Sequence, residues 1–220
     1  MKRIQSVIFD FNGTLYWDTP YHNQAWDIFL RKHHIRLTAE EKRHKIHGKL
    51  NKDILTGVFE RTLTGHEIEI MVREKEQIYR EICLQHPLQL APGAPGFLDY
   101  LKTAGISFTI ATAAERSNMD FYFDTLKLDR WFSLDRIIYN DGSFRGKPDP
   151  QIFLMAMNHL NAESQETCIF EDSFAGIRAA KNAGAGKIII VNSQNIDYSE
   201  WPFEVIRDFR EVDRKLFEMA

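Results

Sequence analysis

The sequence contains little cysteine and no long hydrophobic run. Only two of its 220 residues are cysteines. Cys83 and Cys168 form neither a disulfide framework nor a CxxC pair, which is typical of a protein from a reducing compartment. No apolar run approaches the roughly 20 residues that a membrane span requires, and Asp10 interrupts the apolar start before a signal peptide could form. We therefore expect a soluble, cytoplasmic protein with no membrane partner.

The sequence also lacks an excess of charge of one sign. Its 28 Lys and Arg residues stand against 31 Asp and Glu residues, for a formal net charge of −3. Without a bulk basic excess, we expect no nucleic-acid partner. With 44% hydrophobic and 27% charged residues, the composition is that of a globular protein with a substantial buried core.

Short apolar runs that are typical of buried strands occur on both sides of a long helical region. Residues 7–9 form the first run and end at the turn pair Asn12-Gly13, and further runs lie at 106–111, 167–170 and 187–191. Amphipathic segments separate the later runs, which favours βαβ units and a parallel sheet. Residues 20–87 have helical periodicity instead.

The first strand needs partners, and the sequence offers none before about residue 106. We therefore predict one α/β domain with a parallel Rossmann-like sheet, made of residues 1–16 and 90–220. A helical unit of residues 17–89 is inserted after the first strand, and prolines and glycines at 87–96 mark the return. Within this unit, the charged run 73–76 is expected to form a solvated helix face.

Polar residues follow each predicted strand where ligands bind in an open parallel sheet. They are Asp10 and Asn12, then Thr112, Lys147 and Glu171-Asp172. Each has an ordinary structural explanation on its own: an Asx turn, a helix cap, a rigid turn or a helix N-terminus. Together, carboxylates, a hydroxyl and a lysine at one edge suit a divalent metal and a phosphoryl group.

In these residues the chain resembles the haloacid dehalogenase (HAD) superfamily, and within it the subgroup of β-phosphoglucomutase and phosphoglycolate phosphatase. Residues 7–15 match the first family motif, Thr112 the second, Lys147-Pro148 the third and residues 170–173 the fourth. The resemblance spans essentially the whole chain. It implies a HAD core with an inserted helical cap.

The resemblance also implies a phosphohydrolase mechanism with Mg²⁺ as cofactor. Asp10 would be the nucleophile that forms an aspartyl-phosphate. Asp10, Asp172 and the main-chain carbonyl of Asn12 would bind Mg²⁺, with Glu171 in support. Phosphoryl transfer depends mainly on positioning and charge neutralisation, which these residue types provide.

The remaining expected roles concern the substrate, a small phosphorylated metabolite. By the same resemblance, Thr112 and the neighbouring Ala113 would bind the phosphoryl oxygens, and Lys147 would neutralise Asp10 and the transferring group. In the cap, His22 is a candidate for substrate contact or proton transfer, with a plain surface position as an equally good interpretation. Asn51 lies where relatives have a specificity loop. We expect a monomer or weak dimer.

Two further cap histidines, His44 and His47, have the i, i+3 spacing of a helical metal site. The sequence offers no third ligand for them. We therefore expect both to be exposed to solvent rather than to bind a metal.

Asn12 departs from the family pattern, because the phosphatases have a second aspartate there that acts as general acid and base. An amide cannot shuttle a proton, and such a group is commonly worth about 10²–10⁴ in rate. If no other group supplies the proton, Asn12→Asp should raise kcat for an alkyl phosphate by about 10² or more.

Several functions therefore stay open. We favour a Mg²⁺-dependent phosphatase, slow or specialised for good leaving groups such as acyl phosphates. The alternatives are an impaired phosphate-ligand sensor or interaction protein, an original aspartate replaced by engineering, and, ranked lower, a sugar-phosphate mutase or a phosphonate hydrolase. Phosphonate-cleaving relatives use a cap lysine about three residues after a cap glycine. In this sequence the residue three positions after Gly48 is Asn51 and not lysine.

Overall fold

A six-stranded parallel sheet forms the centre of the computed structural model, which describes residues 3–218. The strand order is β3-β2-β1-β4-β5-β6. The strands are β1 (Ser6–Phe9), β2 (Ser107–Glu115), β3 (Ile138–Asn140), β4 (Thr167–Glu171), β5 (Lys187–Val191) and β6 (Glu204–Ile206). The α/β fold with a parallel sheet that the sequence predicts is confirmed.

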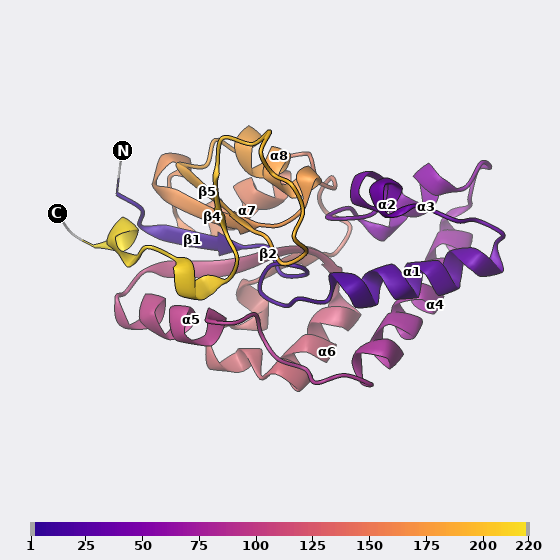
Figure 1. Ribbon diagram of the computed structural model, residues 1–220, viewed down its shortest axis with the longest axis horizontal. Coiled ribbons are helices and arrows are strands. Elements are labelled where there is room, and N and C mark those ends of the chain that lie inside the picture. The colour runs from indigo at the N-terminus through magenta and orange to yellow at the C-terminus, as the bar shows by residue number, and fades with distance from the viewer. Residues whose placement is uncertain (1–2, 219–220) are drawn as a thin grey trace.

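Helices cover both faces of the sheet, which is why its central strands consist of apolar runs. Figure 1 shows α5 (Ala94–Thr103) and α6 (Arg116–Leu126) on one face, and α7 (Gln151–Leu160) and α8 (Phe174–Asn182) on the other. Every residue of β1 and β4 is buried as a result.

The register of the central strands brings the predicted site residues to one edge. Phe9, the last residue of β1, pairs with Ile110 of β2 and with Phe170 of β4. The backbone N–H of Asp10 donates to the carbonyl of Phe170 at 2.9 Å. The side chains that follow these three positions therefore meet at the carboxyl edge of the sheet.

Four helices lie beyond that edge, on the right of Figure 1. They are α1 (Thr19–Lys32), α2 (Ala39–Lys45), α3 (Asn51–Val58) and α4 (Gly65–Cys83). Capping boxes at Thr38 and Thr64 define the starts of α2 and α4. The helices share a hydrophobic cluster that includes Trp26, Phe29 and Leu55. All four fall within the predicted cap range of 17–89, and we keep that division into domains as a proposal.

Some sequence expectations need correction. The strand predicted at 106–111 continues to Glu115, and the three-residue strands β3 and β6 were missed because their patterns are too short to recognise. The charged run 73–76 is not wholly a solvated face, because Lys75 is 1% and Glu76 4% exposed. Across residues 3–218, none of the helices combines the length and apolar character of a membrane span.

Candidate active site

Three acids and one lysine meet at the carboxyl edge of the sheet, and all four are buried. Lys147 Nζ lies 2.6 Å from Asp10 Oδ1 and 2.5 Å from Glu171 Oε1. Glu171 also accepts from the backbone N–H of Ser173 at 2.6 Å, so most of its acceptor capacity is occupied. Asp172 accepts from the Thr14 hydroxyl at 3.3 Å.

The carboxylates of this cluster carry more negative charge than Lys147 can neutralise. Burial raises the pKa of Asp10 to about 7, although Lys147 opposes the shift. Burial raises the pKa of Asp172 well above its usual value, and the neighbouring carboxylates of Glu171 and Asp10 add to this shift. Burial alone would lower the pKa of Lys147, but the two carboxylates that it contacts raise it. Three carboxylates against one ammonium leave two negative charges to compensate, which fits a divalent cation.

The geometry of the acids supports the same conclusion. Asp10, Glu171 and Asp172 each offer a carboxylate oxygen, and these atoms lie within 4.8 Å of one another. Among the described residues this is the one such group that the structure contains. Hard oxygen donors at this spacing are the ligands that Mg²⁺ and Ca²⁺ take in proteins.

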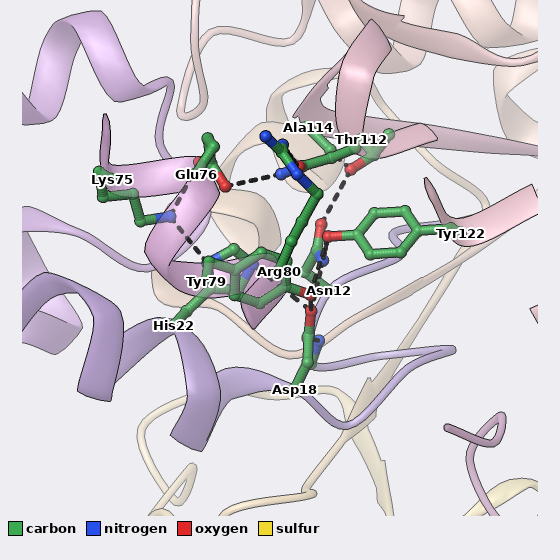
Figure 2. A network of polar contacts seen from close by, with 12 residues as sticks. Asn12, Asp18, His22, Lys75, Glu76, Tyr79, Arg80, Thr112, Ala114 and Tyr122 are labelled. Atoms are coloured by element: carbon green, nitrogen blue, oxygen red, sulfur yellow. Dashed lines mark hydrogen bonds and ion pairs between the residues drawn. The ribbon is translucent and has the colours of Figure 1, made fainter. Parts of the chain in front are cut away.

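Asn12 and Thr112 lie beside this cluster. The Thr112 hydroxyl donates to Asn12 Oδ1 at 3.3 Å and accepts from the backbone N–H of Ala114 at 3.1 Å. The amide nitrogen of Asn12 points the other way, toward Asp18 at 2.6 Å and Tyr122 at 2.8 Å. Figure 2 shows Asn12 at the centre of this set of contacts.

A pocket that opens to solvent lies between the sheet edge and the helices α1–α4. Predicted site residues from both parts line it: Asp10, Asn12, Thr112, Ala113 and Asp172 from the sheet edge, and His22 and Asn51 from the helices. Lys147 and Glu171 are not among the lining residues, and Lys147 reaches the site through its contact with Asp10. The structure thus brings all the predicted site residues together.

The pocket wall formed by α4 contains a buried polar network that the sequence analysis missed. Lys75 Nζ lies 2.8 Å from Glu76 Oε1 and 2.9 Å from His22 Nδ1. Glu76 also accepts from the amide groups of Asn51 at 2.8 Å and Asn118 at 2.7 Å. Burial would raise the pKa of Glu76, but Lys75 and the other partners lower it to about 2. The charged pair is therefore neutral as a whole.

A signal for this network was present in the sequence. Lys75 stands four residues after Met71 and four before Tyr79, on the apolar stripe of α4. Lys is almost never fully buried unless it is paired, so a lysine on a buried stripe requires a partner.

The three candidate histidines of the helical part behave differently. The His22 ring stacks on Tyr79 with centroids 3.8 Å apart, and its Nε2 lies 3.4 Å from Asp18 Oδ2. His47 lines the pocket rather than facing solvent, and burial lowers its pKa to about 4. His44 is exposed, as predicted. Within the described chain, neither His44 nor His47 belongs to a group with metal-ligand geometry.

Comparison with known proteins identifies the family of the chain. A sequence model of the family described as haloacid dehalogenase-like hydrolase matches residues 4–184, most of the chain. The chain belongs to this family. The hydrolase class that the motifs predict is therefore confirmed.

Individual relatives resemble this HAD hydrolase over nearly its whole length. The phosphorylated carbohydrates phosphatase of Thermotoga maritima is 27% identical over 197 residues, 87% of this chain and 88% of the relative. A HAD hydrolase of family IA, variant 3, from Entamoeba histolytica has a structure with a TM-score of 0.86, 30% identity and 97% coverage of both chains. β-Phosphoglucomutase from Clostridium difficile shares the fold, with a TM-score of 0.81, 23% identity and coverage of 96% and 94%.

Gly176 gives a direct test of the packing behind the HAD site. A Cβ at this position of α8 would lie 1.6 Å from Glu171 Oε1, so the carboxylate would have to move. We expect Gly176→Ala to lower the free energy of unfolding by about 1–3 kcal/mol, because overpacking outweighs the gain in helix propensity. Urea denaturation measures this change in the free energy of unfolding. Gly96 of α5 has no atom near its Cβ position, so a Gly96→Ala control should be neutral or stabilising, and equal effects of the two would contradict the expectation.

Proposed function

We propose that this HAD hydrolase is a Mg²⁺-dependent phosphatase of small phosphorylated metabolites that forms an aspartyl-phosphate at Asp10. The observation that carries the proposal is the position of Asp10 in the pocket, with Lys147 on one oxygen and Asp172 beside it. A carboxylate whose charge is matched by a lysine and a cation can approach an anionic phosphoryl group without strong repulsion.

Each side chain has a role that follows from its place. Asp10, Asp172 and the main-chain carbonyl of Asn12 would hold Mg²⁺, which when bound neutralises charge on the phosphoryl oxygens. Glu171 would support the site through its contacts with Lys147 and with the backbone of Ser173, as one of the three acids whose charge the cation would compensate. The Thr112 hydroxyl makes a long hydrogen bond to Asn12 that a phosphoryl oxygen can replace.

The chemistry takes place in two displacements. In the first, an oxygen of Asp10 attacks phosphorus and the ester P–O bond breaks, and the departing oxygen keeps the bonding electrons and takes a proton from solvent water to become the alcohol. In the second, water attacks the phosphoryl group on Asp10 and the bond from phosphorus to the Asp10 oxygen breaks, which regenerates the carboxylate and releases inorganic phosphate. The pocket walls hold the substrate in line for both steps.

The walls of the pocket favour a hydroxyl-rich substrate. Lys75 is already neutralised by Glu76, and Asn51 is held by Glu76, so the wall offers hydrogen-bonding groups with little net charge. Such groups pair well with the hydroxyls of a sugar or polyol. This matches the carbohydrate phosphates named for the Thermotoga relative.

The test is phosphate release from a panel of sugar phosphates and from p-nitrophenyl phosphate, with and without Mg²⁺. We expect turnover that EDTA abolishes and Mg²⁺ restores. Specific binding of a sugar phosphate without turnover would instead favour the sensor function. Absence of both would overturn the proposed substrate class.

The metal role has its own test. We expect Asp172→Asn to raise the Mg²⁺ concentration needed for half-maximal activity by about 10- to 100-fold, because a charged ligand is lost from the buried site. Calorimetric titration with Mg²⁺ should show the same weakening without any substrate. Asp120→Asn, on an exposed surface pair with Arg116, is the control, and an equal Mg²⁺ requirement in both variants would exclude Asp172 as a ligand.

A further inference from the structure

Asn12 belongs to a closed ring of hydrogen bonds with Asp18, Tyr79 and Tyr122. Asn12 Nδ2 donates to Asp18 Oδ2 at 2.6 Å and to the Tyr122 hydroxyl at 2.8 Å. Tyr122 donates to the Tyr79 hydroxyl at 2.9 Å, and Tyr79 donates to Asp18 Oδ2. Asp18 and both tyrosines are completely buried. Figure 2 shows the ring around the Asn12 side chain.

The carboxylate fixes the direction of every bond in this ring. Asp18 Oδ2 accepts from Asn12 Nδ2 and from the Tyr79 hydroxyl, so Tyr79 gives its single hydroxyl proton to Asp18. Tyr79 can then only accept from Tyr122, and Tyr122, having donated, can only accept from Asn12. Both amide hydrogens of Asn12 are therefore used, and the assignment of its nitrogen and oxygen is determined by the ring.

The orientation decides what Asn12 presents to the pocket. Its Oδ1 faces the Thr112 hydroxyl at 3.3 Å on the pocket side. Asn12 thus has no hydrogen left for a leaving oxygen, but it has a carbonyl lone pair for a hydrogen-bond donor. A side-chain amide that accepts from water in this way orients the attacking water of small GTPases.

We infer that Asn12 is a water-positioning residue for hydrolysis of the aspartyl-phosphate and that Asp18 is the residue that orients it. The inference deepens the proposed phosphatase function and rests on it. The water oxygen attacks phosphorus, the bond from phosphorus to the Asp10 oxygen breaks, and Asp10 leaves as a carboxylate. Both water protons stay with the product as dihydrogen phosphate, so no further reactant is required.

This arrangement changes the expectation for Asn12→Asp that the sequence alone suggests. The new carboxylate would face Asp18 and the Tyr122 oxygen, and neither has a hydrogen to donate in the present ring. We therefore expect the single variant to gain less than about threefold in kcat for a sugar phosphate, instead of about 10².

Exchanging Asn12 and Asp18 should give a carboxylate at position 12 the hydrogen-bond donors that it lacks in the single variant. In Asn12→Asp/Asp18→Asn, the amide at position 18 can donate to the new carboxylate and to Tyr79, Tyr79 to Tyr122, and Tyr122 to the new carboxylate. Every bond of the ring is then kept in reverse, and the backbone N–H of Gly13, now 3.1 Å from Asp18 Oδ1, keeps its acceptor. We expect the double variant to exceed Asn12→Asp in kcat by about tenfold or more.

The decisive variant is Asp18→Asn alone, assayed with p-nitrophenyl phosphate, whose departure needs no acid. With an amide at position 18, the Asn12 amide turns over and presents N–H instead of C=O to the pocket. We expect kcat to fall about tenfold or more, while KM and Mg²⁺ affinity stay within about twofold. Asp120→Asn is the control, and intact-mass analysis verifies that Asn12 has not deamidated.

The outcomes separate the inference from the function on which it rests. No Mg²⁺-dependent turnover by the parent would overturn both. Turnover with an unchanged kcat in Asp18→Asn, or a gain of about 10² in Asn12→Asp alone, would overturn the inference and leave the phosphatase.

A spectroscopic measurement keeps the inference testable if a variant fails to fold. In protein labelled with ¹⁵N-asparagine, both side-chain amide protons of Asn12 should exchange slowly with solvent, because both are donated inside a buried ring. Fast exchange of either proton in the parent protein would overturn the assigned orientation.

Discussion

Asp10→Asn should abolish the hydrolysis of every phosphate ester that the parent protein accepts, with a loss in kcat of about 10⁴-fold or more. An amide has the shape of the carboxylate but lacks the nucleophilic oxygen that would form the aspartyl-phosphate. Loss of activity should not come from unfolding, because the replacement is isosteric and Lys147 keeps its 2.5 Å contact with Glu171. Steady-state assays on fresh protein, with Asp120→Asn as the control, measure the effect.

The same substitution should stabilise the metal-free protein at neutral pH. Burial raises the folded-state pKa of Asp10 from 3.8 to about 7, so its ionisation costs folding free energy that increases as the pH rises through that range. A neutral amide removes this cost. Urea denaturation in EDTA at pH 7.5 should therefore give a higher midpoint for Asp10→Asn than for the parent. An inactive variant with a lower midpoint would point to misfolding, and activity within tenfold of the parent would contradict the role of Asp10 as nucleophile.

Glu76→Ala should lower the free energy of unfolding by about 3–5 kcal/mol, the effect of leaving a buried charge unpaired. Lys75 is 1% exposed and would keep only His22 Nδ1 as an acceptor. The amide groups of Asn51 and Asn118 would each lose an acceptor as well. Urea denaturation at pH 7 measures the loss.

A matched control and the pH dependence identify the cause. Lys75→Met/Glu76→Leu removes both charges and should cost much less than the single variant, since buried pairs are often replaceable by apolar residues. The folded-state pKa of Glu76 is lowered from 4.5 to about 2. Its stabilisation is therefore present above about pH 4.5 and is lost as the pH falls toward 2, so the gap between the parent and Glu76→Ala should narrow from pH 5 to pH 3. A double variant as unstable as the single one would show that lost packing is responsible.

The fold class and the cluster around Asp10 could be predicted from the order of residue types along the chain. The buried strand before Asp10 and the one before Glu171 are recognisable because a strand covered on both faces must be a continuous apolar run. Neighbouring parallel strands have their carboxyl ends at the same edge of the sheet. Asp10, Thr112 and Glu171, which lie at these ends, are therefore expected close together. The family motifs at these positions then identified the hydrolase class, which the comparison confirmed. The cytoplasmic location and the oligomeric state stay predictions.

The surroundings of Asn12 and Lys75 depend on the packing of distant segments and could not be predicted in the same way. Residues 20–87 have helical periodicity, but a periodic pattern specifies a face of a helix and not the residues that this face contacts. Asn12 contacts Asp18 six positions away and Tyr122 110 positions away, and the direction of those hydrogen bonds follows from the closed ring as a whole. Lys75 lies on the apolar stripe of α4, where the Trp26 ring of α1 packs against it and Glu76 is its charge partner. Residue types and spacing fix which groups are available, but the protons and charges that they share depend on contacts that form only when distant segments pack together.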